Sequence, residues 1–79
     1  MTDKKLIHNL SIKICDLYKV REVIDESEYE EKMTQYLIEL LAESSISDEE
    51  YETRKNSLRY YGFKKSDILE ALQIGLNEL

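Results

Sequence analysis

Residues 46–63 carry both a helix start and a helix stop, and this stretch constrains the fold more than any other. Ser47 is a favoured N-cap residue, and Glu50 follows it at the spacing of a capping box. Gly62 can adopt the left-handed conformation that ends many helices. Because this helix is fixed at both ends, the segments before and after it must turn back, so we expect further helices packed against it.

Apolar side chains recur every three or four residues elsewhere in the chain and predict three more helices. The four predicted helices run from Thr2 or Asp3 to Ile24, from Glu28 to Glu43 after a Ser27 cap, from Ser47 to Gly62, and onward from a Ser66 cap. Short connections make successive helices antiparallel or sharply crossed. The predicted fold is all-α: a small antiparallel bundle of about four helices, or three with a long first arm, in a single domain over residues 1–79.

Gly75 falls inside the last predicted helix. Glycine at such a position costs roughly 1 kcal/mol relative to alanine. It marks either a close helix crossing or fraying near the terminus. The predicted apolar face of this helix consists of Ile68, Ala71, Leu72, Gly75, Leu76 and Leu79.

The net charge of −6 restricts the choice of partner. Binding to a phosphate backbone needs clustered lysine and arginine, so the acidic total argues against direct nucleic-acid binding. The single cysteine excludes an internal disulfide and a multi-cysteine zinc site, and it fits a reducing cytoplasm. No apolar run resembles a signal peptide or approaches a membrane span. We therefore expect a cytoplasmic protein without a membrane segment.

A second row of residues lies roughly opposite the apolar stripe of the first predicted helix. This second row consists of His8, Ile12, Cys15, Lys19 and Val23. A surface helix should not carry Ile12 and Val23 on its outer side. Either other helices wrap this helix on both sides, or Ile12, Cys15 and Val23 meet another chain, which is the interpretation that we prefer.

Tyr51, Leu58 and Tyr61 share one predicted face of the helix over residues 47–62, and Tyr60 points away from it. Tyrosine rings with polar ends suit half-buried positions and interfaces. We therefore predict that Tyr60 is exposed and contacts a partner.

Basic residues gather in the same part of the chain, at Arg54, Lys55, Arg59, Lys64 and Lys65. Two interpretations are open. These residues pair with acids on a solvated surface, or they form a weak nucleic-acid patch on which Tyr60 stacks against a base. The acids considered are Asp48, Glu50, Glu52 and Asp67.

An acidic cluster precedes and opens the second predicted helix, at Asp25, Glu26, Glu28, Glu30 and Glu31. Acids at a helix start are favoured by the helix dipole, so a solvated helix end explains the cluster without a function. The alternative is an acidic surface for a basic partner, such as a nucleic-acid-binding protein whose phosphate contacts the cluster mimics. In that case Asp25, Glu26, Glu28 and Glu31 bind the partner. The pattern lacks the glycine-containing loop of a calcium site.

The sequence offers no catalytic constellation. His8 has no second ligand at the helical spacings of three or four, and Cys15 has no CxxC partner or neighbouring base. Phosphate-binding glycine loops and hydrolase motifs are missing as well. We predict a protein that is not an enzyme and that has no metal and no cofactor.

Two segments resemble known families. Residues 40–58 resemble the short helical-hairpin module called SHOCT, on the match of Ile46, Ser47, Glu49, Glu50, Tyr51, Arg54, Lys55 and Leu58. That resemblance implies a role in oligomerisation. Residues 33–79 are similar to one three-helix repeat of the RecX family, which modulates RecA filaments, on the match of Leu58, Gly62, Phe63, Ile68 and Leu72. The second helix of that match is about a turn longer here, and the family carries several repeats of basic character.

Together these patterns predict a non-enzymatic helical interaction module that self-associates, for example as a homodimer, or docks on a protein partner. The alternative is a small acidic, phage-encoded modulator or inhibitor of a nucleic-acid-handling protein. The short chain, rich in lysine, glutamate and isoleucine, is compatible with a bacterial or prophage gene.

Overall fold

A computed structural model describes the backbone of residues 3–77 and the side chains of residues 3–75. Within residues 3–77 the chain forms four helices and no strand. The helices are α1 (Lys4–Lys19), α2 (Glu26–Glu43), α3 (Asp48–Tyr61) and α4 (Lys65–Asn77). The predicted all-α fold is confirmed.

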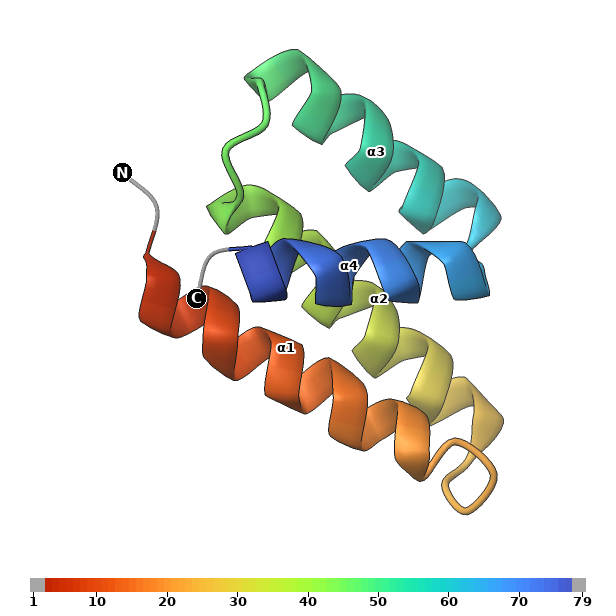
Figure 1. Cartoon of the computed structure of the whole chain (residues 1–79). Coiled ribbons are helices and arrows are strands. Elements are labelled where there is room, and N and C mark those ends of the chain that lie inside the picture. Colours follow the sequence, from red (N-terminus) through yellow and green to blue (C-terminus); the bar gives the residue numbers. More distant parts are fainter. Residues whose placement is uncertain (1–2, 78–79) are drawn as a thin grey trace.

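The helices form a bundle around α2. In Figure 1, α1 and α2 lie side by side and run in opposite directions, and α4 packs across both of them. In the described part of the chain, the backbone of α3 approaches α2 alone. The α1–α2 and α3–α4 connections lie on the same side of the bundle, opposite the α2–α3 connection. Leu58 is the one buried residue of α3, so this helix contributes little to the core.

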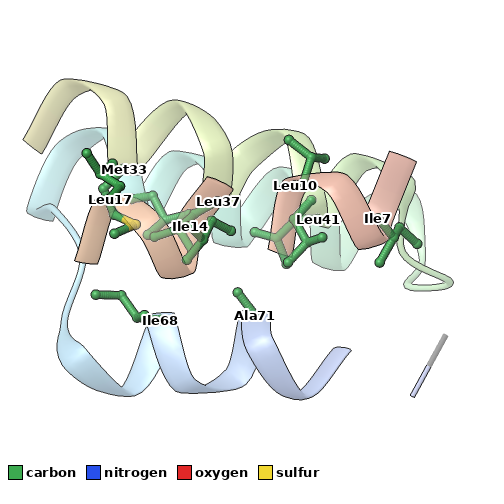
Figure 2. Packing of buried hydrophobic residues seen from close by; sticks show 11 residues of the cluster. Ile7, Leu10, Ile14, Leu17, Met33, Leu37, Leu41, Ile68 and Ala71 are labelled. Atoms are coloured by element: carbon green, nitrogen blue, oxygen red, sulfur yellow. The ribbon is translucent and has the colours of Figure 1, made fainter. Parts of the chain in front are cut away.

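The core consists of apolar side chains at helical spacing on α1 and α2, completed by α4. Leu58 supplies the contribution of α3, and Ile68 and Ala71 of α4 point toward the buried side chains of α1 and α2 (Figure 2). Burial of a large apolar side chain contributes roughly 1.5–3 kcal/mol, so this cluster is the main source of stability. Its members are Ile7, Leu10, Ile14, Leu17, Met33, Leu37, Leu40, Leu41, Leu58, Ile68 and Ala71.

The first helix is shorter than predicted. The predicted start was Thr2 or Asp3. Asp3 is the N-cap of the helix, and Thr2 lies outside the described residues. The helix ends at Lys19, and the chain continues as a turn rather than as a helix to Ile24. The Tyr18 carbonyl accepts both the Arg21 backbone N–H at 3.3 Å and the Arg21 guanidinium at 2.8 Å, and these bonds close the end of the helix. The β-branched residues that follow also have low helix propensity.

The second helix begins before the predicted start. Asp25, not Ser27, is the N-cap, and its carboxylate accepts a hydrogen bond from the Glu28 backbone N–H at 3.3 Å. Aspartate caps a helix as well as serine does. The early end of α1 leaves Asp25 in an extended conformation, so the helix starts there.

The last helix also starts earlier than the predicted Ser66 cap. The Asp67 carboxylate accepts a hydrogen bond from the Lys64 backbone N–H at 2.7 Å, and the helix runs from Lys65. This is the return contact of a capping box, in which the third helical residue reaches back to the cap. Ile68 and Ala71 are buried and Leu72 is half-buried, as predicted. The predicted positions of the Leu76 and Leu79 side chains lie outside the described residues.

The third helix has the predicted boundaries. The Ser47 hydroxyl accepts a hydrogen bond from the Glu50 backbone N–H at 3.1 Å. At the other end, the Gly62 N–H donates to the Leu58 carbonyl at 3.0 Å, and Gly62 itself has a φ of 80°. Its ψ of −179° differs from that of the left-handed helix, so the chain leaves Gly62 extended and Phe63 continues toward α4.

Gly75 marks a close crossing of α4 with α1. A Cβ atom built at this position would overlap the Ser11 hydroxyl and lie 2.8 Å from Ser11 Cβ. The Ser11 hydroxyl itself donates to the Ile7 carbonyl at 2.9 Å. Of the two predicted roles of this glycine, the close crossing is therefore the one that the structure supports.

Candidate functional site

The second row of α1 is not covered by the other helices. Ile12 is 46% exposed, His8 and Lys19 are exposed, and Cys15 is half-buried. The interpretation that other helices wrap α1 on both sides is therefore wrong. Val23 is 85% exposed, but it lies in the turn after α1 and so does not continue the row.

The C-terminal end of α3 presents two tyrosines to solvent. Tyr60 is 80% exposed, as predicted. Tyr61 is 87% exposed, and its predicted place beside Tyr51 and Leu58 on the inner face is wrong. Since the backbone of α3 approaches α2 alone and Leu58 is its buried residue, the covered stripe is narrow, and the last residue of the helix lies beyond it.

The structure divides the acidic cluster into two groups. Asp25 caps α2, and Glu28 forms an ion pair with Lys32 at 2.9 Å, so these two carboxylates serve the helix itself. Glu26, Glu30 and Glu31 instead line an open groove. Only part of the predicted acidic surface thus faces a space that a partner can enter.

This α2–α3 groove lies between the α1–α2 turn, the first half of α2 and the end of α3. It is open to solvent and has a volume of about 960 Å³. The turn and α2 supply the carboxylates, and the end of α3 with the residue after Gly62 supplies Arg59, Tyr61 and Phe63. Neither Tyr61 nor Phe63 was predicted to take part in a site. The acids are Glu22, Glu26, Glu30 and Glu31.

The floor of the groove is apolar beneath these charges. Tyr29 and Phe63 meet edge to face, with their ring centroids 5.6 Å apart, and Leu58 lies beside them at the end of the core. Burial raises the pKa of the Tyr29 phenol, while the positive charge of Arg21 partly opposes this shift. The groove therefore joins an apolar floor to charged walls.

The charged side chains that line the groove form no ion pairs with other described residues. In the part of the chain that the structure describes, none of its four glutamates and neither of its two arginines forms an ion pair. The Arg21 guanidinium is turned back onto the Tyr18 ring, 4.0 Å from the ring centroid, and Arg59 faces the groove from α3. With four carboxylates against two guanidiniums, the groove is acidic.

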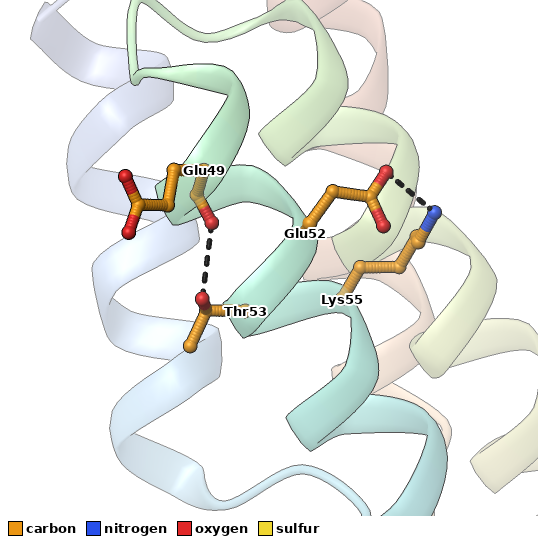
Figure 3. Close-up of polar contacts among 4 residues, drawn as sticks. All are labelled: Glu49, Glu52, Thr53 and Lys55. Carbon is orange, nitrogen blue, oxygen red and sulfur yellow. Dashed lines mark hydrogen bonds and ion pairs between the residues drawn. The ribbon is translucent and has the colours of Figure 1, made fainter.

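The basic residues of α3 are partly engaged. Lys55, which is half-buried, pairs with Glu52 at 3.0 Å, as predicted, and on a different side of α3 the Thr53 hydroxyl donates to the Glu49 carbonyl (Figure 3). Arg54 pairs across to Glu70 of α4 at 2.6 Å, a partner that was not predicted. The other predicted pairs, with Asp48, Glu50 and Asp67, are not formed among the described residues.

A second hollow lies between α2, α3 and α4. It encloses about 80 Å³ and is lined by residues such as Leu37, Arg54 and Ala71. Small-molecule sites usually measure about 300–1,000 Å³. This hollow is therefore a packing defect beside the Arg54–Glu70 pair and not a ligand site.

The described residues contain no group of three or more histidine, cysteine, aspartate or glutamate side chains arranged to hold a metal ion. Cys15 is a free thiol. None of the helices in residues 3–77 is both long enough and apolar enough to cross a membrane.

No protein-family model, curated protein or solved structure matches the chain. The resemblances to SHOCT and to a RecX repeat therefore stay predictions from the sequence. Any functional conclusion has to come from the geometry of the exposed surface.

Proposed function

We propose that the chain is a non-enzymatic interaction module that docks on a protein partner. The observation that carries the proposal is that large, highly exposed side chains lie in the segments that border the α2–α3 groove. Tyr61 lines the groove. In the sequence, Val23 stands between two lining residues of the groove, and Tyr60 comes directly before Tyr61. All three side chains are at least 80% exposed. Large aromatic and aliphatic side chains exposed together are typical of binding surfaces.

The proposal is tested by affinity capture with the tagged full chain from a lysate of the cells that produce it. Wild type is compared with the double variant Val23→Ser and Tyr61→Ser, and with Leu69→Ser as a matched control. Leu69 is 57% exposed on α4, outside the groove. We expect one protein in stoichiometric amount, lost with the double variant and kept with the control. The same eluate from all three would contradict a docking site here, provided that circular dichroism shows equal helix content.

The interaction module has a second proposed form, in which it self-associates through α1. Ile12 and the half-buried Cys15 leave apolar surface uncovered on α1, and the SHOCT resemblance implies oligomerisation. Light scattering on the purified chain is the test. A dimer that Ile12→Glu converts to a monomer with unchanged helix content would support this form, whereas a wild-type monomer at high concentration would refute it.

A second function is favoured by the acids in the groove. The module would then be an acidic modulator of a nucleic-acid-handling protein, with Glu26 and Glu31 taking the place of phosphates. Glu26→Lys combined with Glu31→Lys should abolish binding of such a partner, because the contact is electrostatic. Binding unchanged at both low and high salt would exclude it. The free Cys15 thiol fits a reducing compartment, and we place the module in the cytoplasm.

A further inference from the structure

The inner face of α2 changes character halfway along the helix. Leu41, Leu37 and Met33 are buried in the core at steps of four residues. The same row continues toward the start of the helix with Glu30 and Glu26, at steps of three and four, and both are exposed. Side chains at these spacings lie on one face of a helix. Two carboxylates thus occupy the positions where the core would otherwise continue.

The core ends at this point because a carboxylate cannot be buried alone. Placing an unpaired charge in an apolar environment is strongly unfavourable. The bundle accordingly leaves the α2–α3 groove open in front of Glu26 and Glu30. At its floor, Tyr29, Phe63 and Leu58 present apolar surface that belongs to the edge of the core. The groove thus combines an apolar floor with walls that carry four glutamates and two arginines.

The occupant can be deduced from the two chemistries that meet in the groove. Glu28 is neutralised by Lys32, whereas the four groove glutamates have no cation of the described chain paired with them. An entering segment must supply cations to these carboxylates and apolar side chains to the aromatic floor. Charge-assisted hydrogen bonds from lysine or arginine to carboxylates satisfy the first need. The apolar face of an amphipathic helix satisfies the second.

Resting on the proposed function, we infer that the α2–α3 groove binds an amphipathic basic segment of a protein partner, with its lysines or arginines on Glu26 and Glu30 and its apolar face on Tyr29 and Phe63. Nucleic acid is repelled by the same carboxylates. A second copy of this chain is acidic overall, with a net charge of −6, and is repelled at long range.

The experiment uses the full chain and a fluorescent synthetic peptide of roughly 15–20 residues, long enough to form a helix. The peptide carries leucines along one face and arginines beside them. A second peptide has glutamate in place of each arginine, and a double-stranded oligonucleotide is the third probe. Binding is followed by fluorescence anisotropy at low and high salt. Light scattering on each protein variant reports self-association.

The test variant is Glu26→Gln with Glu30→Gln. Its matched control is Asp16→Asn with Glu39→Gln, which removes the same charge from exposed positions outside the groove. We expect the arginine peptide to bind wild type and the control within about two-fold of each other, and the test variant about ten-fold more weakly, as loss of two charge pairs implies. The difference should shrink as salt rises.

Four results would overturn the inference: no binding of the arginine peptide to wild type, equal binding of the glutamate peptide, equal weakening by the control variant, or preferred binding of the oligonucleotide. A wild-type dimer that only the test variant dissociates would identify a second copy as the occupant and would overturn it too. The proposed function fails separately. A captured partner that is lost with Val23→Ser and Tyr61→Ser but kept with Glu26→Gln and Glu30→Gln would uphold docking and refute the basic segment.

Discussion

Replacing Gly75 by alanine tests how closely α1 and α4 cross. At an exposed helical position this replacement stabilises a protein by about 1 kcal/mol, because alanine has the higher helix propensity. Here the new Cβ would overlap the Ser11 hydroxyl and lie 2.8 Å from Ser11 Cβ. Turning the hydroxyl away would break its bond to the Ile7 carbonyl and still leave the two Cβ atoms too close. One helix must therefore move.

The expected magnitude follows from these opposing effects. Overpacking of this kind costs about 1–3 kcal/mol. After subtracting the gain in propensity, Gly75→Ala should lower the free energy of unfolding by about 1 kcal/mol. Ser11→Gly removes both atoms that the new methyl group meets. In that background Gly75→Ala should instead raise the free energy of unfolding by about 1 kcal/mol, because propensity alone remains. The coupling between the two substitutions is then about 2 kcal/mol, within the range for residues in contact.

The four proteins of this double-mutant cycle are compared by urea unfolding, followed by circular dichroism. An alanine and a glycine variant at Asn56, which is exposed on α3, measure the propensity difference in the same protein. Suppose that Gly75→Ala stabilises by as much as that difference, with or without Ser11→Gly. The close crossing would then be refuted, and Gly75 would be a residue of a fraying helix end.

Four other substitutions test three local features of the fold. Ser47→Ala should lower the free energy of unfolding by about 1 kcal/mol in urea unfolding, since it removes an N-cap, and an unchanged midpoint would refute the cap. Asp25→Ala should cost a similar amount and Ser27→Ala much less, and the reverse order would make Ser27 the cap. Tyr29→Phe should remove a component that titrates above pH 10 from the tyrosinate absorbance, because burial raises this pKa. The stability from neutral Tyr29 is present below the unfolded pKa of about 10 and is lost as the pH rises through the folded pKa, so Tyr29→Phe should reduce the loss of stability in alkali.

The start of α3, where one capping signal stands alone, was predicted correctly, whereas the start of α2, where two compete, was not. Ser47 has no rival cap nearby, and α3 begins where the sequence indicates. Before α2, both Asp25 and Ser27 are good caps, and each has a glutamate three residues later, at Glu28 and Glu30. Local spacing cannot separate the two candidates. In the structure the turn after α1 closes with bonds from the Val23 and Ile24 N–H groups to the Val20 carbonyl, and Asp25, the next residue, is the cap.

Burial of the tyrosines depended on packing that the sequence does not encode locally. Tyr51, Leu58 and Tyr61 share a face by helical spacing, yet Tyr61 is 87% exposed and Leu58 is buried. The prediction assumed that helices flank α3 on more than one side. In the described chain the backbone of α3 lies close to that of α2 and not to that of α4, and its covered stripe ends one turn before Tyr61.

The groove shows how a site can be read from the row that forms the core. The acids within residues 25–31 form a cluster of charge in the sequence, and they were considered together as one acidic surface. Helical spacing distinguishes these acids from one another. Glu30 and Glu26 lie on the same face of α2 as Leu37 and Met33, whereas Glu28 lies on another face. A carboxylate on a core row must find a cation inside the bundle or face an opening. No charged residue is buried in the described structure, so the bundle opens there, and the position of Glu30 determines where the core stops and the groove begins.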